Sequence, residues 1–288
     1  MRRHSCEEVA SVLPAHSRRS TTPGPGTVPA PIHIRAHIGS ASGSGRAARI
    51  GEARSDLVGW GKRKTCSIRS SFHSERRVSG LSLEQHWDAV YRDRVPELVT
   101  WHQDNPALSL SLIAATGLGT DASVVDVGGG CSRLADCLLE EGFTNLTVLD
   151  VSSVALGYGR QRLGNRADDV TWIEADVLQH HFDAAFDLWH DRAVFHFLVD
   201  PADQDRYVER LTDAVPSGGH VIISTFALDG PDRCSGLPVQ RYGPEDLSRA
   251  LGDKFEAADF QHETHHTPTG ATQQFLYARF QRRTEDSP

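Results

Sequence analysis

Two groups of residues in this 288-residue sequence have the types and the spacing that chemistry requires. The first is a loop of three consecutive glycines, Gly128, Gly129 and Gly130, which follows an apolar run and has Asp126 two residues ahead of it. A glycine loop between a strand and a helix lets a ligand approach the backbone closely. The second is the segment HDRAVFH, residues 190–196, which supplies imidazole, carboxylate and guanidinium groups. The sequence therefore predicts a nucleotide-like ligand with reactive side chains nearby.

The spacing of the glycines excludes two common phosphate-binding loops. A dinucleotide fingerprint has glycines at its first, third and sixth positions, and the sixth position counted from Gly128 is Arg133. A P-loop is excluded because no Gly-Lys-Ser or Gly-Lys-Thr follows. An acidic residue beside the loop, Asp126, suits a positively charged ligand better than a phosphate.

The elements that must position these residues follow from the hydrophobic pattern. Short apolar runs alternate with helix-like segments, which predicts a parallel sheet with helices on both faces. In such sheets ligands bind at the carboxyl ends of the strands, so both groups are expected at that edge. The predicted strands are residues 123–127, 146–150, 170–174, 186–189 and 220–226, and the predicted helices between them are residues 132–141, 153–163 and 203–215.

Segments on either side of this pattern complete the predicted fold. Ser82 and Gln85 have the spacing of a capping box, which predicts an opening helix, and a second helix is expected within residues 105–117. Near the C-terminus, residues 254–264 and 271–280 flank a turn that contains proline and glycine. These two runs are expected to form an antiparallel hairpin that closes the sheet.

The first 80 residues differ in composition from the rest of the chain. They carry 14 basic and 5 acidic residues, a net charge of +9, whereas residues 81–288 carry 16 and 33, a net charge of −17. Segments rich in Pro, Gly, Ser and Arg without apolar periodicity cannot offset the entropy of ordering. We expect residues 1–80 to be a disordered basic tail or leader and residues 81–288 to form the folded domain. An organellar leader, a solvated tail and sequence upstream of the true start remain alternatives.

The glycine loop resembles the first motif of class I S-adenosylmethionine-dependent methyltransferases, in which an acidic residue precedes alternate glycines. Asp126, Gly128 and Gly130 fit that motif, with Gly129 between the two glycines and Ser132 in the place of a third alternate glycine. The resemblance implies a Rossmann-like α/β fold with a seven-stranded, mostly parallel sheet, helices on both faces and a C-terminal antiparallel hairpin. The implied cofactor is S-adenosyl-L-methionine, whose sulfonium and ammonium groups suit an acidic neighbour.

Further cofactor contacts are implied by the same resemblance. Asp150, at the end of the second predicted strand, is expected to accept hydrogen bonds from both ribose hydroxyls. Asp176, after the third strand, is expected to meet the adenine amino group, with the Val177 amide facing the ring. Val151 and Trp189 complete the expected cofactor contacts.

The segment HDRAVFHFL is similar to a Trp-Asp-Arg-Gly/Ala segment of thiopurine-type and related small-molecule methyltransferases, with His190 in the place of the tryptophan. This resemblance implies that His190, Asp191 and Arg192 lie near the transferred methyl group. An imidazole titrates near neutral pH and could act as a general base, whereas an arginine suits an anionic group. Helix capping, core packing and ion pairing remain structural alternatives for these side chains.

Two further regions are expected to border the acceptor. Trp87, Tyr91 and Trp101, which precede the sheet, would form a lid over the cofactor or pack as helix aromatics. The long loop after the fifth predicted strand, residues 229–247, would overhang the acceptor and place Cys234 there.

These observations predict a methyltransferase that acts on a small-molecule acceptor. A protein lysine methyltransferase of the same fold and an inactive cofactor-binding interaction module remain alternatives. The acidic body argues against nucleic-acid binding, and no run of 18 apolar residues predicts a membrane span. The cysteines form no CxxC pair and the HETHH run, residues 262–266, lacks a metal-ligand spacing, so no metal is expected. We expect a cytoplasmic protein.

Overall fold

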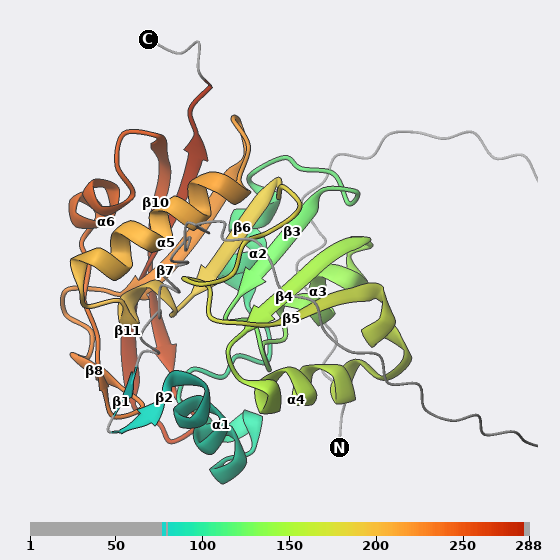
Figure 1. Cartoon of the computed structure of the whole chain (residues 1–288), viewed down its shortest axis with the longest axis vertical. Helices are drawn as coiled ribbons and strands as arrows, with labels where there is room; N and C mark the ends of the chain where they lie inside the picture. The colour runs from blue at the N-terminus through green and yellow to red at the C-terminus, as the bar shows by residue number, and fades with distance from the viewer. Residues whose placement is uncertain (1–76, 79, 285–288) are drawn as a thin grey trace, which may run out of the picture. The chain divides into compact units, whose positions relative to one another are not determined.

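The structure, a computed structural model, describes residues 77–78 and 80–284 (Figure 1). These residues include the whole domain expected from the sequence except its last four residues. The basic segment that we expect to be disordered lies almost entirely outside the described residues. Within the described part of the chain, no helix is both long and apolar enough to cross a membrane.

A seven-stranded sheet forms the centre of the domain (Figure 1). Its strand order is β10-β11-β7-β6-β3-β4-β5, and β11 alone runs in the direction opposite to the other strands of this sheet. The predicted Rossmann-like α/β sheet with a C-terminal antiparallel hairpin is therefore confirmed. The strands are β3 (Ser123–Val127), β4 (Asn145–Asp150), β5 (Val170–Glu174), β6 (Leu188–Arg192), β7 (His220–Phe226), β10 (Phe255–His266) and β11 (Thr272–Arg282).

Helices cover both faces of the sheet because successive strand residues point to opposite faces and both sets are apolar. Buried leucines of α2, α3 and α4 pack on one face with Val124 and Leu188, and those of α5 and α6 pack on the other with Val125 and Val127. The helices are α2 (Ala107–Ala114), α3 (Leu134–Glu140), α4 (Ser153–Leu163), α5 (Pro201–Ala214) and α6 (Pro244–Leu251), with short 3-10 turns η2 (Pro96–Leu98), η3 (Gly164–Asp169) and η4 (Phe195–Phe197).

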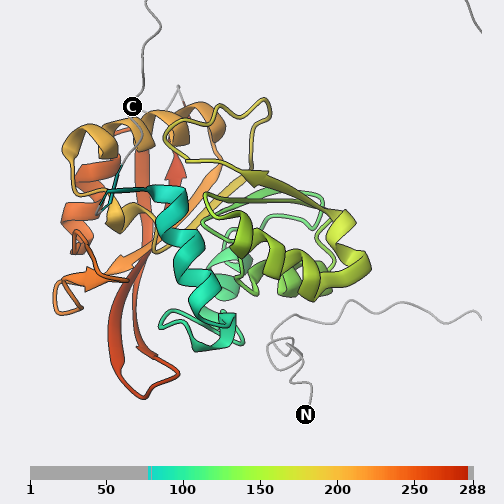
Figure 2. The same cartoon turned by 60° about the horizontal axis from the view of Figure 1, so that its bottom comes forward.

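An opening helix, α1 (Leu83–Asp93), lies across the carboxyl edge of the sheet (Figure 2). Its predicted capping box is present, with Ser82 and Gln85 exchanging two hydrogen bonds of 3.1 Å. Two short hairpins flank the same region. They are formed by β1 (Arg77–Val78) with β2 (Leu81–Ser82), and by β8 (Arg233–Cys234) with β9 (Leu237–Pro238).

The strand β6 differs from its prediction, which placed it at residues 186–189. It begins at Leu188 and continues to Arg192, because its polar residues pair with β3 on one side and with β7 on the other. A ladder on both sides satisfies the backbone whatever the side chains are. His190, Asp191 and Arg192 therefore lie within the strand and alternate between its two faces.

Candidate active site

A cavity of about 500 Å³ lies at the carboxyl edge of the sheet, where β3 has β4 on one side and β6 on the other. Open α/β sheets bind ligands at such a reversal of strand order. The cavity is bordered by the ends of the strands, by α1 and by the β8–β9 hairpin. Residues that line it include Trp87, Tyr91, Trp101, Gly128, Asp150, Val151, Asp176, Val177, Arg192, Phe197, Phe226, Cys234 and Phe275.

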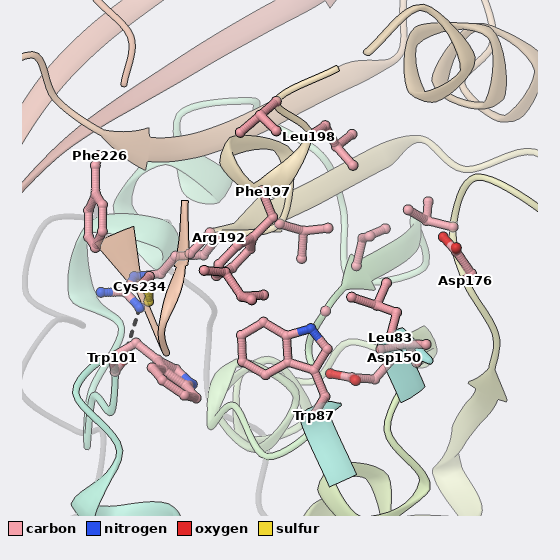
Figure 3. Close-up of a pocket in the computed structure, with 18 of the residues that line it drawn as sticks. Leu83, Trp87, Trp101, Asp150, Asp176, Arg192, Phe197, Leu198, Phe226 and Cys234 are labelled. Atoms are coloured by element: carbon pink, nitrogen blue, oxygen red, sulfur yellow. Dashed lines mark hydrogen bonds between the residues drawn. The ribbon is translucent and has the colours of Figure 1, made fainter. Parts of the chain in front are cut away.

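The charged side chains of this cavity are segregated (Figure 3). Asp150 and Asp176 lie at one end, and Arg192 lies at the other, beside Cys234 of the β8–β9 hairpin. Trp87, between the two ends, comes from α1 and lies over the cavity. The two ends therefore suit ligand groups of opposite charge.

The glycine loop passes so close to neighbouring side chains that only glycine fits. Gly128 has a φ of +70°, and a Cβ there would lie 2.1 Å from Val194 Cγ2. A Cβ on Gly129 would lie 2.4 Å from Asp126 Oδ2, and one on Gly130 would lie 2.5 Å from Asp150 Oδ2. The three glycines thus bring the loop against the two carboxylates that the sequence singles out.

Asp150 ends β4 and lines the cavity, and its contact with the ribose stays a prediction. Its Oδ1 accepts a 2.8 Å hydrogen bond from the Ser152 amide. Burial raises the pKa of Asp150 to about 7, and the nearby Asp126 and Asp88 carboxylates act in the same direction. A buried carboxylate of this kind is stabilised by any ligand that donates hydrogen bonds to it.

Asp176, Val177 and Val151 line the same end as Asp150. The Asp176 Oδ1 accepts a 3.0 Å hydrogen bond from the Leu178 amide, which holds the turn after β5. Among the described residues, the buried Val177 amide donates no hydrogen bond. A buried amide of this kind is free to donate to a ligand.

Arg192 is held at the other end by several partners. Its Nε donates to the Tyr277 hydroxyl at 2.7 Å, one Nη donates to the Trp101 carbonyl at 2.9 Å, and the guanidinium lies 4.5 Å from the centre of the Phe275 ring. Glu263 lies 3.7 Å from the other Nη, which has no hydrogen-bond partner in the described structure. The cation is thus fixed, with one N–H group available.

His190 lies on the same face of β6 as Arg192, two residues further from the end of the strand and away from its predicted place near the acceptor. It is only 2% exposed, and its Nδ1 and Nε2 form hydrogen bonds of 2.7 Å with Asp126 Oδ1 and 2.9 Å with Ser109 Oγ. It does not line the 500 Å³ cavity. The structure gives no support to its predicted role as the base that meets the acceptor, because the ring lies behind the glycine loop with both nitrogens occupied.

Asp191 and Trp189 point to the face that α5 covers. Asp191 is fully buried and accepts hydrogen bonds from the amides of Val194 and Phe195 and from the Tyr207 hydroxyl. The same hydroxyl accepts a hydrogen bond from the indole N–H of Trp189. Neither residue lines the large cavity or the smaller one beside the glycine loop. The structure gives no support to the predictions of a catalytic Asp191 and a cofactor-binding Trp189, since the strand alternation that brings Arg192 to the cavity buries both residues.

The turn that Asp191 holds explains the small residue after Arg192. Ala193 has a φ of +73°, a conformation that glycine and, at a cost, alanine adopt more readily than larger residues. His196, in the next turn, is fully buried, and burial together with the Arg192 charge lowers its pKa to about 3. It therefore stays neutral and lines neither cavity.

A second, smaller cavity of about 50 Å³ adjoins the glycine loop and shares Tyr91, Trp101, Gly128 and Arg192 with the large one. Its lining includes Asp126, Gly129, Arg133 and His190. Among the described residues, Asp126 Oδ2 and Arg133 Nε are buried without a hydrogen-bond partner. A carboxylate oxygen and a guanidinium N–H without partners, from residues that line one cavity, suit a ligand group that carries both an ammonium and a carboxylate.

Sequence reasoning missed the side chains that hold this site together. Arg162 of α4 donates to the carbonyls of Cys131 and Ser132 at 2.8 and 2.5 Å, and so fixes the end of the glycine loop. Ser109 of α2 and Asp88 of α1 are fully buried near the site, 0% and 4% exposed. Each acts on a partner more than 25 residues away in the chain, so no local pattern could have indicated it.

Residues 124–219 match the model of a family described as a methyltransferase domain. The chain is 23% identical over 158 residues to an eEF1A lysine and N-terminal methyltransferase of Danio rerio, and 25% identical over 154 residues to Nodulation protein S of Rhizobium tropici. These matches cover 54% and 52% of this chain but 23% and 63% of the relatives, so the chain spans less than two thirds of either relative.

A solved structure shares the fold. The 1,6-didemethyltoxoflavin-N1-methyltransferase of Burkholderia thailandensis, determined with S-adenosylhomocysteine and 1,6-didemethyltoxoflavin, has a TM-score of 0.52 and 22% identity over 70% of this chain and 84% of its own. Residues 124–219 thus match a methyltransferase domain, and the described residues have the fold of S-adenosylmethionine-dependent methyltransferases. The narrower resemblance to thiopurine-type methyltransferases stays a prediction.

S-adenosyl-L-methionine is the cofactor that the methyltransferase match indicates, and the buried polar groups of the site fit it. The Asp150 carboxylate suits the ribose hydroxyls, and the Val177 amide and Asp176 suit the adenine. Asp126 Oδ2 and Arg133 Nε, both without partners among the described residues, suit the ammonium and carboxylate of the methionine tail. In the part of the chain that the structure describes, no cluster of His, Cys, Asp or Glu could hold a metal ion in this methyltransferase.

Proposed function

We propose that this chain transfers a methyl group to a small acceptor that has an apolar body and an anionic group. The observation that carries the proposal is the segregated cavity, with carboxylates at the Asp150 end and a fixed arginine among aromatic rings at the other. Its volume of about 500 Å³ lies within the range of roughly 300–1,000 Å³ that is typical of small-molecule sites. With the cofactor at the Asp150 end, the space that remains suits a compact acceptor.

S-adenosylmethionine supplies, when bound, a methyl group activated by a sulfonium, so the reaction needs a positioned nucleophile and little further chemistry. The chain contributes positioning and exclusion of water. Trp87 lies 5.1 Å from the Phe197 ring and 5.9 Å from the Trp101 ring, measured between ring centroids, and the three rings cover the cavity. A dry cavity strengthens the electrostatic interactions within it.

The described lining offers no side chain suited to act as a base at the acceptor end. Burial raises the pKa of the Cys234 thiol to about 11 and also raises the pKa of the Tyr91 hydroxyl. Asp150 and Asp176 lie at the far end, and none of the described residues that line this cavity is a histidine. The acceptor therefore brings a nucleophile that is already ionised at neutral pH, or an amine with a free lone pair.

Arg192 favours the ionised acceptor. Its available Nη can donate a charge-assisted hydrogen bond, and Arg233 adds a second positive charge on the β8–β9 hairpin. Glu263 offsets part of the Arg192 charge, yet it does not line the cavity. Together these features support an acidic thiol, phenol or carboxylic acid as the acceptor class.

A radiolabelled methyl donor, incubated with the full chain, tests this proposal. Matched acids and neutral analogues, such as thiobenzoate and benzamide, are offered as acceptors beside amines and a cell lysate. We expect label in the acids, and a rise of about 10-fold to 150-fold in the acceptor KM for Arg192→Gln, the range for a lost charged hydrogen bond. Arg160→Gln, which removes an exposed arginine outside the cavity, should leave the KM unchanged.

The alternatives predict different results in the same assay. Label in protein bands alone would identify a protein methyltransferase, the activity named for the Danio rerio relative. Binding of the donor without transfer to any acceptor would identify an inactive cofactor-binding module. Transfer to neutral acceptors as readily as to acids would contradict the role of Arg192.

A further inference from the structure

Three buried side chains form a continuous hydrogen-bonded chain behind the glycine loop. Ser109 of α2, His190 of β6 and Asp126 of β3 are 0%, 2% and 5% exposed. The distances are 2.9 Å between Ser109 Oγ and His190 Nε2 and 2.7 Å between His190 Nδ1 and Asp126 Oδ1. Asp126 and His190 are register partners in adjacent parallel strands, so the sheet itself fixes their spacing.

This chain occupies one oxygen of Asp126 and leaves the other free. With a single proton on the imidazole, Nδ1–H donates to Asp126 Oδ1 and Nε2 accepts the hydroxyl proton of Ser109. Oδ2 has no hydrogen-bond partner among the described residues, and Asp126 lines the smaller cavity. The carboxylate is thus held in one rotamer with a single oxygen available to a donor.

We propose that His190, supported by Ser109, is a positioning residue that holds Asp126 for the ammonium group of the cofactor. This inference rests on the proposed function, with the methionine tail of the cofactor in the smaller cavity. Without the His190 donor, Asp126 would be a buried carboxylate with no compensating partner. Such a group takes up a proton or rotates, and either change removes the acceptor that an ammonium needs.

The alternative role for His190 is packing between the sheet and α2. Packing would affect every ligand of the site in the same way, because loosening the sheet would displace the ribose and adenine contacts as well. A role through Asp126 affects only ligands that carry the ammonium group. The affinities of two ligands, one with the amino-acid tail and one without it, therefore distinguish the two roles of His190.

Calorimetric titration of the full chain with S-adenosylhomocysteine and with 5′-methylthioadenosine, which lacks the amino-acid tail, makes this comparison. For His190→Leu we expect S-adenosylhomocysteine to bind at least about 10-fold more weakly, and 5′-methylthioadenosine to keep its affinity within about 3-fold. His190→Asn, whose amide can donate in the place of Nδ1, should restore most of the loss. Ser109→Ala should give a smaller loss of the same kind.

His220→Leu is the matched control, since His220 is also a buried strand histidine and lines neither cavity. It should change neither affinity. An equal loss for both ligands in His190→Leu, or an unchanged affinity for S-adenosylhomocysteine, would overturn the proposal. If His190→Leu does not fold, His190→Asn and Ser109→Ala carry the same comparison. If the chain transfers no methyl group, the binding affinities still test the role of His190. If the wild-type chain binds neither ligand, the proposed function itself is rejected.

Discussion

The carboxylate of Asp88 in α1 accepts a 2.7 Å hydrogen bond from the hydroxyl of Ser152, which caps α4. The Ser152 amide in turn donates to Asp150, the carboxylate that we assign to the ribose. Residues 64 positions apart in the sequence thus fix α1 to the strand end that meets the cofactor. Trp87, next to Asp88 in α1, lies in the cavity wall (Figure 3).

Removal of the Asp88 carboxylate should therefore affect both stability and cofactor binding. Asp88→Ala leaves the buried Ser152 hydroxyl without its acceptor, which costs about 1–3 kcal/mol, and it frees the helix that covers the cavity. We expect a lower melting temperature and weaker binding of S-adenosylhomocysteine, measured by calorimetry. Arg92→Ala removes only the exposed partner of Asp88 and should change both little. An Asp88→Ala protein with wild-type affinity would show that α1 does not order the site.

Asp150 should account for a large share of cofactor affinity. Losing charged hydrogen bonds costs about 1.5–3 kcal/mol, so Asp150→Ala should weaken cofactor binding by roughly 10-fold to 150-fold while the fold is retained. Calorimetry with S-adenosylhomocysteine measures the loss, and thermal unfolding checks the fold. Asp253→Ala, an exposed substitution outside the cavity, serves as control. Unchanged affinity in a folded Asp150→Ala protein would show that the ribose lies elsewhere.

The raised pKa of Asp150, about 7, makes cofactor affinity depend on pH. The ribose hydroxyls need the carboxylate as acceptor, so affinity should rise between about pH 6 and pH 8 and fall as the free protein becomes protonated below pH 7. Asp150→Asn should bind weakly and without this pH dependence. Calorimetric titrations of both proteins across this range measure the effect, and a flat wild-type profile would contradict it.

The same pKa shift has the opposite sign for stability. The pKa of Asp150 in the folded protein lies above the usual value of 3.8. The contribution of Asp150 to the free energy of unfolding is therefore complete below pH 3.8 and is lost as the pH rises through about 7. Asp191, whose pKa burial raises to about 6, acts in the same direction at slightly lower pH. Rising pH should therefore strengthen cofactor binding while it erodes this part of the stability.

Gly128 has both a positive φ and a close neighbour, whereas Gly117 has only the positive φ and so serves as its control. Gly117 has a φ of +74°, and a Cβ added there would meet no atom within 4 Å, so Gly117→Ala should cost only the backbone strain, about 1–2 kcal/mol. Gly128→Ala adds a contact of 2.1 Å with Val194 and should cost more, with clear loss of cofactor binding. Val194→Ala in the same protein should recover part of that loss. Thermal unfolding and calorimetry of the variants test this, and equal effects at the two glycines would contradict it.

Much of the fold could be predicted from the sequence, because its signals are local. The alternation of apolar runs with helical segments predicted the sheet, and the strands at residues 123–127, 170–174 and 220–226 have the expected bounds. The glycine loop and Asp150 were also predicted, since backbone conformation and strand ends depend on neighbouring residues. Asp150, Gly128 and Gly129 line the cavities, whereas Gly130 lines neither of the two.

The faces of β6 could not be predicted in this way. A strand that is paired on both sides tolerates polar residues, so its end at Arg192 depends on the ladders with β3 and β7 and not on its own composition. That end decides which way each side chain points, because neighbours along a strand face opposite sides. Arg192 reaches the large cavity, Asp191 turns into the core beneath α5, and His190 meets Asp126 only because the tertiary fold places β6 beside β3.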